Sequence, residues 1–422
     1  MLNRELTTKN NNFMFADVFS GCGGISLGLI NAGWQGCFAI EKNITAFETL
    51  KTNLVIGRRG NFKWPSWLPI EALTTADLLT EYERELESLK GNLSLLAGGP
   101  PCQGFSMAGR RTHSDPRNSL TEEYIKLVEK LQPRMLLIEN VRGFTLPFKK
   151  HGNGQSKDVP YSAKVTELLE LAGYKVFSDL VDLSAYGVPQ TRTRFIIVAI
   201  RKDDPAVRKL GERTPFEILA DYRERFLLAK GLPVDRPVTV REAIHDLEIT
   251  GKELIDSVDS NKKGFKQIKY ATNGKRSNFI ELMRVDADGA PCCLRLPRHK
   301  QRTIQHFSTI IATCVKGKTL SKEDRQRMGI KKHAITPLHG DLPSATITTL
   351  PDDMIHYSEP RVLTVRENAR IQTFPDWYRF TGNYTTGTVN RKNECPRYTQ
   401  VGNAVPPLFS EAIGRVLMEL IS

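Results

Sequence analysis

Residues Phe13–Gly24 read FMFADVFSGCGG, an apolar run that ends in a glycine-rich turn. The segment Met14–Phe19 has the length of a buried strand, and Ile25–Ala32 continues at helical spacing. This arrangement is typical of α/β sheets that bind nucleosides, because glycines let the backbone approach a ligand beside a helix N-terminus. The dinucleotide fingerprint is incomplete, since Ser26 stands where its third glycine would fall. An ordinary tight turn is the alternative interpretation.

The alternation of apolar runs and helical segments continues to residue 200. Further strands are predicted at Cys37–Ile40, Leu93–Ala97, Met135–Glu139, Tyr174–Val181 and Phe195–Ile200. Helices are predicted between them at Glu81–Leu89, Ser119–Lys130 and Ala163–Leu171. This pattern predicts an α/β fold with a doubly wound, mostly parallel sheet that is covered on both faces.

The alternation fades after Arg201, which suggests a second structural unit. We predict a large domain at residues 1–203, and an inserted smaller, mixed and irregular domain at 204–345. A hinge and interface segment is expected at 346–395. The last segment, 396–422, contains an apolar helical pattern at Leu408–Ile421, and this helix is expected to return to the large domain.

Positive charge is concentrated in one region. The 422 residues carry a formal net charge of +13, and residues 261–333 contain 18 Lys or Arg against five Asp or Glu. This stretch therefore carries the entire excess. A concentrated positive field usually faces a polyanion, nucleic acid first of all, although a merely soluble surface is the alternative.

The composition also excludes several classes of protein. No apolar run approaches the about 18 residues that span a bilayer, and the polar N-terminus lacks an apolar signal core. We therefore expect no membrane contact and a cytoplasmic location. The seven cysteines include no Cys-x-x-Cys pair, so neither a disulfide framework nor a zinc ribbon is indicated, and no metal site is predicted.

Residues Gly98–Ser106 read GGPPCQGFS and directly follow a predicted strand. Two prolines stiffen the backbone before Cys102 and present its sulfur at the carboxyl edge of the sheet. We interpret Cys102 as a nucleophile rather than as a core thiol. Its thiolate would need positive potential, which Arg192, Arg194 or a helix terminus would supply.

Two further segments bring polar groups to the sheet. Glu139 ends an apolar strand, where a carboxyl group is expensive unless it is paired or moves protons, for example at a ring nitrogen of a bound base. Residues Gln190–Arg194 read QTRTR, and alternation places Gln190, Arg192 and Arg194 on one face. These guanidinium groups would bind a carbonyl oxygen and a phosphate, or form a structural ion pair.

Two acids are candidates for a nucleoside cofactor. Glu41 stands twenty residues after Gly21, at the end of the second predicted strand, where it can accept the ribose hydroxyls. Asp77 precedes the next strand and could meet an adenine amino group. The alternative for Glu41 is an ordinary surface position.

Taken in order, these motifs resemble the DNA cytosine-5 methyltransferase family. The resemblance includes Phe19–Gly24, Pro100–Gln103, Glu139–Val141 and Gln190–Arg194, and continues through Arg366–Asp376 and Gln400–Pro407. Val18 stands where Leu is common and Asn368 where Ala is usual, and neither position has a chemical role.

The resemblance implies a methyl transfer from S-adenosylmethionine to cytosine C5 through a covalent bond between Cys102 and C6. It assigns catalysis to Cys102, Glu139, Arg192 and Arg194. It assigns cofactor binding to Phe19, Gly21, Cys22, Gly23, Gly24, Glu41, Asp77, Leu78, Pro100, Leu120, Asn403 and Ala404. Double-stranded DNA would contact Gln103, Ser106, Arg110, Arg111 and Gln190, and residues 204–345 would form the target-recognition domain. The cytosine must be flipped out of the helix, and the loop Gln103–Asn118 would close behind it.

Three alternatives remain. An RNA cytosine-5 methyltransferase acting on transfer RNA shares the motifs, but its Cys-Phe-Thr signature is absent. A dinucleotide-dependent oxidoreductase is disfavoured by the broken glycine pattern, and a non-enzymatic DNA-binding scaffold by the intact Cys102, Glu139 and Arg194. By analogy, we expect a monomer in a bacterial restriction-modification system, with a separate endonuclease that recognises the same site.

Overall fold

The computed structural model describes residues 13–57, 60–100, 118–146, 160–260, 262–271, 274–385 and 394–422. The side chains of residues 118 and 119 are not included in this description. Cys102 and the predicted DNA contacts Gln103, Ser106, Arg110 and Arg111 lie outside the described residues.

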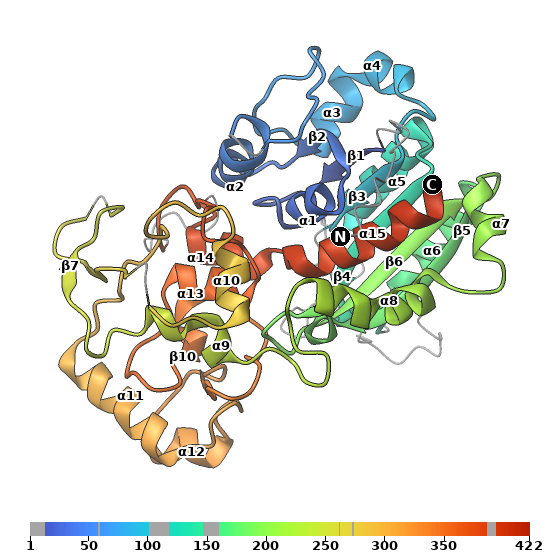
Figure 1. The fold of residues 1–422 in the computed structure, drawn as a ribbon. Helices are drawn as coiled ribbons and strands as arrows, with labels where there is room; N and C mark the ends of the chain where they lie inside the picture. The colour runs from blue at the N-terminus through green and yellow to red at the C-terminus, as the bar shows by residue number, and fades with distance from the viewer. Residues whose placement is uncertain are drawn as a thin grey trace, which may run out of the picture.

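A six-stranded sheet forms the centre of the molecule (Figure 1). Its strands are β1 (Met14–Val18), β2 (Gln35–Ile40), β3 (Leu95–Gly98), β4 (Met135–Val141), β5 (Tyr174–Asp182) and β6 (Thr193–Arg201). Their order is β2-β1-β3-β4-β6-β5, with β1 to β4 parallel and β6 antiparallel to both of its neighbours. The six predicted strands and the mostly parallel sheet are confirmed.

Side chains alternate between the two faces of the sheet, and each face has its own core. Phe15, Leu95 and Leu137 pack on one face with residues of α1 (Gly24–Ala32) and α15 (Pro407–Ile421). Ala16 and Leu136 pack on the other face with residues of α5 (Asn118–Leu131) and α6 (Tyr161–Leu171). The sheet is therefore covered on both faces, as the apolar runs predict.

Further helices lie beside the sheet. They are α2 (Ile44–Leu50), α3 (Thr75–Glu81), α4 (Glu83–Ser88), α7 (Pro205–Leu210) and α8 (Pro215–Ala229). The helix predicted at Glu81–Leu89 corresponds to α4, and α3, which was not predicted, precedes it and meets it at Tyr82. None of the described helices is long and apolar enough to cross a bilayer.

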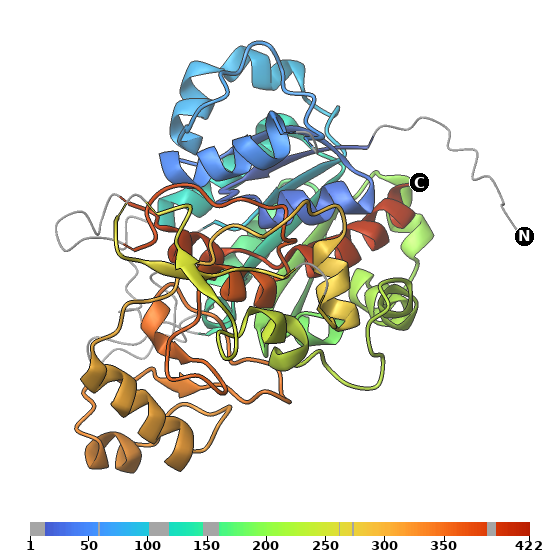
Figure 2. The same ribbon diagram turned by 60° about the vertical axis from the view of Figure 1, so that its left-hand side comes forward.

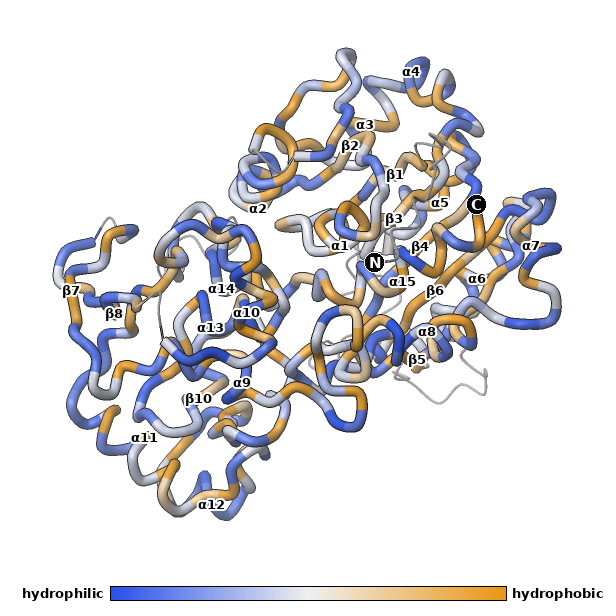
Figure 3. Tube along the Cα trace, in the orientation of Figure 1, coloured by the Kyte–Doolittle hydropathy of each residue, from blue (hydrophilic) through white to orange (hydrophobic). Residues whose placement is uncertain are grey.

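Residues 240–403, here called the small part, lie at one end of the sheet (Figures 1 and 2). Its helices are α9 (Val240–Ile244), α10 (Asn278–Arg284), α11 (Gln301–Thr313), α12 (Lys322–Arg327), α13 (Val365–Ile371) and α14 (Arg397–Asn403). Its strands are β7 (Leu254–Asp256), β8 (Lys266–Ile268), β9 (Thr336–Pro337) and β10 (Met354–Ile355). Hydrophilic residues are frequent around β7 and β8, whereas hydrophobic ones follow the central strands (Figure 3). The inserted unit is irregular, as expected.

The structure differs from the predicted domain limits. Phe216, Leu219 and Phe226 of α8 belong to the core that α15 forms with the sheet, and Lys230 forms a 2.7 Å ion pair with Glu411 of α15. Residues 205–232 therefore belong with the sheet, although the predicted limit lies at 204. The alternation of strands and helices ends with β6 in the sequence. The two helices that come next, α7 and α8, nevertheless pack on the same core.

Candidate active site

The candidate site lies at the carboxyl edge of the sheet. Val18 of β1 pairs with Ile40 of β2 and with Gly98 of β3, and Gly98 also pairs with Ile138 of β4. Since these strands are parallel, the loops that follow them meet at one edge. The glycine loop, Glu41, the segment Gly99–Pro100 and Glu139 are therefore brought together, as the sequence predicts.

The antiparallel direction of β6 adds an arginine to this edge. Val141 near the end of β4 pairs with Arg194 at the start of β6. The Arg194 Nε atom lies 2.8 Å from Glu139 Oε1, and the two side chains are 12% and 14% exposed. A parallel strand would have placed Arg194 at the opposite edge. The predicted Glu139–Arg194 combination is present, and both groups remain accessible to a ligand.

Glu139 also lies beside the segment that leads to Cys102. A Cβ atom on Gly99 would stand 3.5 Å from Glu139 Oε2. The next residue, Asn140, donates from Nδ2 to the Pro100 carbonyl oxygen at 3.2 Å. The approach to Cys102 is thus anchored two residues before it. In the sequence Asn140 stands out only as part of a motif, and this role becomes visible only in the pairing of β3 with β4.

The glycine loop after β1 is shaped for a close approach. Gly23 has φ +89° and precedes α1, and a Cβ atom on Gly24 would lie 2.2 Å from the Val405 carbonyl oxygen. Gly21 has φ +55°, and a Cβ atom there would meet nothing within 4 Å. Phe19, with φ +58°, is half-buried beside this open space. The loop therefore combines strained backbone with room for a ligand.

Glu41 ties the first two loops together. Its Oε2 accepts from the Gly21 N–H at 3.0 Å, and its Oε1 accepts from the Asn43 N–H at 2.7 Å. Burial raises the pKa of Glu41, while the two N–H donors oppose that rise. A carboxylate held in this way is fixed in orientation and retains further acceptor capacity.

The other predicted cofactor residues divide into two groups. Pro100 and Ala404 border the same loops, Asn403 is exposed at the end of α14, and Leu120 is half-buried in α5. Asp77 lies in the first turn of α3, where its Oδ2 accepts from the Thr74 hydroxyl at 2.6 Å.

Two side chains assigned to the cofactor point elsewhere. Leu78 is fully buried in a core with Phe38, and the Cys22 Sγ donates to the Gln400 carbonyl oxygen at 3.5 Å. Only their backbone atoms could reach a cofactor. This corrects the expectation for both side chains, because burial in the core excludes them from a ligand.

The structure also corrects the expected roles of Gln190 and Arg192. Gln190 is fully buried and donates to Gln372 Oε1 at 2.6 Å, so it cannot contact DNA. Arg192 is 2% exposed and donates to the carbonyl oxygens of Gly402 and Ala404 at 3.4 and 3.2 Å. Burial lowers the pKa of Arg192 to about 9. Both residues precede β6, which begins at Thr193, so strand alternation does not apply to them.

Arg192 is consequently a positioning residue. Its hydrogen bonds hold the turn at Gly402–Ala404 against the start of β6, while Val405 of the same turn contacts Gly24. Asn403 is thereby kept at the edge that carries the glycine loop.

Asp17 was not predicted as part of this region. This residue of β1 is fully buried, and its Oδ2 accepts from the Ser26 hydroxyl of α1 at 2.6 Å. Burial raises the pKa of Asp17 to about 7. The signal in the sequence is an acid inside an otherwise apolar strand.

Exposed positive charge gathers on the small part. Lys262 and Lys263 lie between β7 and β8, and Lys300 and Arg302 lie at the start of α11. Other cations of this region are structural. The Arg295 guanidinium stacks between Phe265 and Tyr384, at 4.2 and 3.7 Å from the ring centroids. Only part of the predicted basic field is therefore available to a polyanion.

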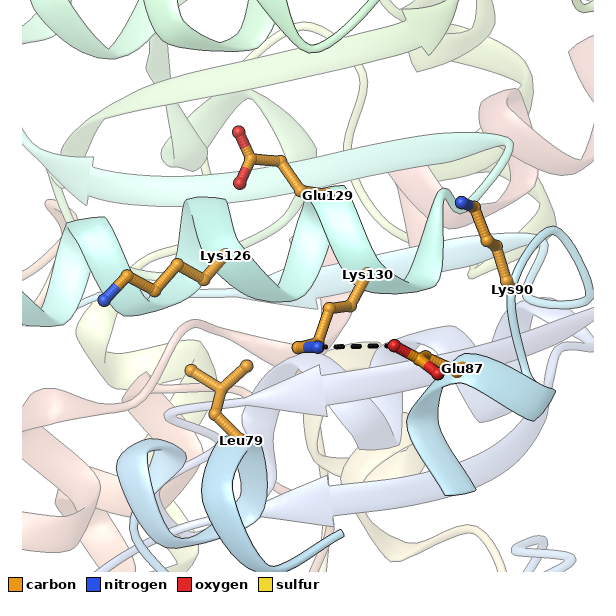
Figure 4. Close-up of a pocket in the computed structure, with 6 residues that line it drawn as sticks. All are labelled: Leu79, Glu87, Lys90, Lys126, Glu129 and Lys130. Atoms are coloured by element: carbon orange, nitrogen blue, oxygen red, sulfur yellow. Dashed lines mark ion pairs between the residues drawn. The ribbon is translucent and has the colours of Figure 1, made fainter. Parts of the chain in front are cut away.

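A separate surface pocket of about 630 Å³ lies between α3, α4 and α5 (Figure 4). It is lined by Leu79, Glu87, Lys90, Lys126, Glu129 and Lys130. Lys130 forms ion pairs with Glu83 at 2.5 Å and Glu87 at 3.7 Å. This pocket shares no residue with the carboxyl edge of the sheet.

The comparison with known families agrees with this geometry. The family model of C-5 cytosine-specific DNA methylases matches residues 13–419. The chain belongs to this family. As a member of the C-5 cytosine-specific DNA methylases, it is a DNA cytosine-5 methyltransferase, and the resemblance noted in its motifs is confirmed.

Relatives of this methyltransferase extend over nearly all of its length. Type II methyltransferase M.DdeI of Desulfomicrobium norvegicum is 29% identical, covering 94% of this chain and 86% of the relative. Type II methyltransferase M.Sau96I of Staphylococcus aureus is 30% identical, covering 98% and 77%. The crystal structure of a putative DNA modification methyltransferase encoded within an E. coli prophage superposes with a TM-score of 0.64 at 24% identity, covering 97% and 99%. This last likeness supports the fold.

Proposed function

We propose that this methyltransferase transfers a methyl group from S-adenosylmethionine to C5 of a cytosine flipped out of double-stranded DNA. The observation that carries the proposal is the Glu139–Arg194 pair, at 2.8 Å, beside the segment Gly99–Pro100 that leads to Cys102. A nucleophile, a proton-handling acid and a fixed cation are the three groups that this chemistry requires.

Cytosine C5 is too weak a nucleophile to attack a methyl donor unaided. The Cys102 thiolate adds to C6, and the electron pair of the C5–C6 bond becomes available at C5. Glu139 holds a proton at N3, and Arg194 binds O2, where negative charge develops. After transfer, loss of the C5 proton and departure of the sulfur restore the aromatic ring. A stacked base cannot undergo this addition, so the cytosine must leave the helix.

The chain's own residues would hold the cofactor at the glycine loop. Phe19 stacks on the adenine, Glu41 binds the ribose hydroxyls, Asp77 meets the adenine amine, and Asn403 binds the methionine end. The open space above Gly21 and the anchored carboxylate of Glu41 fit such a nucleoside. When bound, S-adenosylmethionine supplies an electrophilic methyl group.

DNA recognition is assigned to the small part. Its exposed Lys and Arg side chains bind phosphates, and other side chains read base edges in the major groove. Arg110, Arg111 and Arg117 add phosphate contacts from the loop that closes behind the base. Because several relatives are named Type II methyltransferases, we place this enzyme in a bacterial restriction-modification system. It acts there in the cytoplasm as a monomer, and a separate endonuclease cuts the same site.

Incubation with tritiated S-adenosylmethionine tests the proposal. Label is expected in double-stranded DNA and absent from transfer RNA, and bisulfite sequencing of the DNA should locate it at cytosines within one short sequence. Cys102→Ala is the control and should leave the DNA unlabelled. Label in transfer RNA alone would replace DNA with RNA as the substrate, and label in neither would refute the proposal.

A further inference from the structure

Two adjacent cysteines of the small part form an unusual contact. Cys292 and Cys293 lie between α10 and α11, and their Sγ atoms are 3.2 Å apart. Cys293 is 1% exposed and has φ +65°, whereas Cys292 is half-buried. The conformation of Cys293 turns the two sulfurs toward each other, although neighbouring side chains in an extended chain point apart. The half-buried residue thus has its sulfur directly beside the sulfur of the buried one.

Two arginines surround this pair. The Arg366 Nη2 of α13 donates to Cys292 Sγ at 3.0 Å, and the Arg397 Nη1 of α14 donates to Cys293 Sγ at 3.3 Å. The hydrogen bond from Cys293 and the charge of Arg366 lower the pKa of Cys292, whereas burial raises that of Cys293. The negative charge of a deprotonated pair is therefore favoured on Cys292, and the proton on Cys293. A partly accessible thiolate beside a guanidinium is the form of cysteine that reacts with electrophiles.

We propose that Cys292 and Cys293 form a second reactive thiol site, separate from Cys102, which hydroperoxides oxidise to a disulfide between the adjacent residues. The proposed methyl-transfer mechanism does not use this site.

The reaction balances with a hydroperoxide as the only oxidant. The Cys292 thiolate attacks the terminal oxygen, the S–O bond forms, the O–O bond breaks, and the leaving alkoxide or hydroxide takes a proton. Cys292 is then an uncharged sulfenic acid. With the neighbouring negative charge gone, Arg397 favours the thiolate of Cys293, which attacks the Cys292 sulfur. The S–S bond forms, the S–O bond breaks, and water leaves with the proton from Cys293.

The site lies where the segment after β7 meets the start of α14. The Cys293 N–H donates to Asp259 Oδ2 at 2.9 Å, and Arg397 Nη1 donates to the same oxygen at 2.8 Å. Asp259 follows β7 and precedes the lysine-rich connection to β8, while Arg397 begins the helix that ends at Asn403. Oxidation would therefore change the hydrogen bonds of Arg397, which links the hairpin of β7 and β8 to the sheet edge.

Peptide mass mapping tests the proposal in the full-length Cys102→Ser chain, which removes the other nucleophile. Both cysteines fall within one tryptic peptide, residues 285–295. After brief treatment with equimolar hydrogen peroxide and then iodoacetamide, this peptide should lose two hydrogens and take up no alkyl group. Dithiothreitol should restore both alkylation sites. The peptide of residues 303–316 carries the half-buried Cys314 and is the matched control, which should remain fully alkylated.

Two further measurements use reagents that react with the thiols or with the sulfenic acid. Phenylarsine oxide bonds two adjacent thiols and releases water, so pretreatment should protect peptide 285–295 from peroxide. In a Cys102→Ser, Cys293→Ser chain, dimedone should label Cys292 after peroxide, because the sulfenic acid has no adjacent thiol with which to form a disulfide. Full alkylation of both cysteines after peroxide, or a disulfide to a distant cysteine, would overturn the proposal.

Discussion

The sheet edge and the small part are held in shape by different means. At the edge, backbone register decides which side chains meet: pairing of Val141 with Arg194 brings Arg194 to Glu139. In the small part the strands are only two or three residues long, and buried ion pairs take their place. Reactive groups are thus positioned by the main chain, and the recognition surface by contacts between side chains.

The ion pairs of the small part are extensive and almost fully buried. Arg361 binds Glu367 through two hydrogen bonds of 2.7 and 2.8 Å and also binds Glu359 at 2.7 Å. Arg370 binds Asp376 at 2.8 and 2.9 Å and also contacts Asp246. Removal of one partner would break a buried ion pair, so the stability of this region depends on every member of each cluster.

The largest expected effect comes from the sheet edge. Glu139→Gln keeps the size of the side chain but removes the acid, and should lower the rate of methyl transfer about 10²–10⁴-fold. Single-turnover transfer from tritiated cofactor measures this, with DNA affinity determined in parallel and expected to stay nearly constant.

The matched control lies at the other end of the same strands. Arg134 Nε binds Asp204 Oδ2 at 2.6 Å next to the start of β4. Asp204→Asn should lower the free energy of unfolding by about 1.5–3 kcal/mol without slowing transfer. An equal loss of transfer rate in both variants would mean that the Glu139–Arg194 pair is merely structural.

Next in size is a loss of stability in the small part. Glu367→Gln breaks the buried two-hydrogen-bond ion pair with Arg361 and weakens the cap at Thr364, and should lower the free energy of unfolding by about 3–5 kcal/mol. Urea unfolding measures this change. Glu253→Gln removes a surface partner of Lys269 and should leave the free energy of unfolding nearly unchanged. Similar values for the two variants would contradict the importance given to buried ion pairs.

A smaller effect concerns the salt dependence of DNA binding. Replacement of Lys262, Lys263, Lys300 and Arg302 by Gln should flatten the slope of log K against log salt by roughly 0.9 for each phosphate that is no longer neutralised. Lys90→Gln and Lys126→Gln, from the surface pocket of Figure 4, form the control and should leave the slope unchanged. The reverse outcome would move the DNA interface to the sheet part.

The last effect is a pH dependence that belongs to the sheet. The pKa of Asp17 is about 7 in the folded chain and about 3.9 when unfolded, so the folded state alone retains the proton between these values. The free energy of unfolding should therefore fall as pH rises through this window. Asp17→Asn should reduce the difference between urea midpoints at pH 5 and pH 8, whereas the exposed Asp256→Asn should not. An unchanged difference in Asp17→Asn would place the titration elsewhere.

The sequence predicts the sheet part well because periodicity and loop chemistry are local. All six strands and the meeting of Glu41, Gly99 and Glu139 follow from apolar runs that end in polar or glycine residues. The antiparallel direction of β6 does not follow from these runs, since strand direction depends on pairing partners. For the same reason the sequence predicts the wrong roles for Gln190 and Arg192. Their partners, Gln372 and Ala404, lie about 180 to 210 residues away in the sequence.

The limits of the small part were less predictable. The helices α7 and α8 follow the last strand onto the sheet core, and nothing in their composition marks them as part of it. The clusters around Arg361 and Arg370 join the motif Arg366–Asp376 to Asp246, Glu359 and Arg361, which look like ordinary surface charge in the sequence. The same is true of Cys292 and Cys293, whose adjacency is visible but whose arginine partners are not.

Trapping with DNA that contains 5-fluorocytosine tests the central claim most directly, because fluorine at C5 blocks the release of the sulfur. In the presence of S-adenosylmethionine, the native chain should form a covalent complex that survives denaturation, and peptide mapping should place the base on Cys102. Cys102→Ala should form none while still binding cofactor. A complex that persists in Cys102→Ala, or that forms at another residue, would contradict the account.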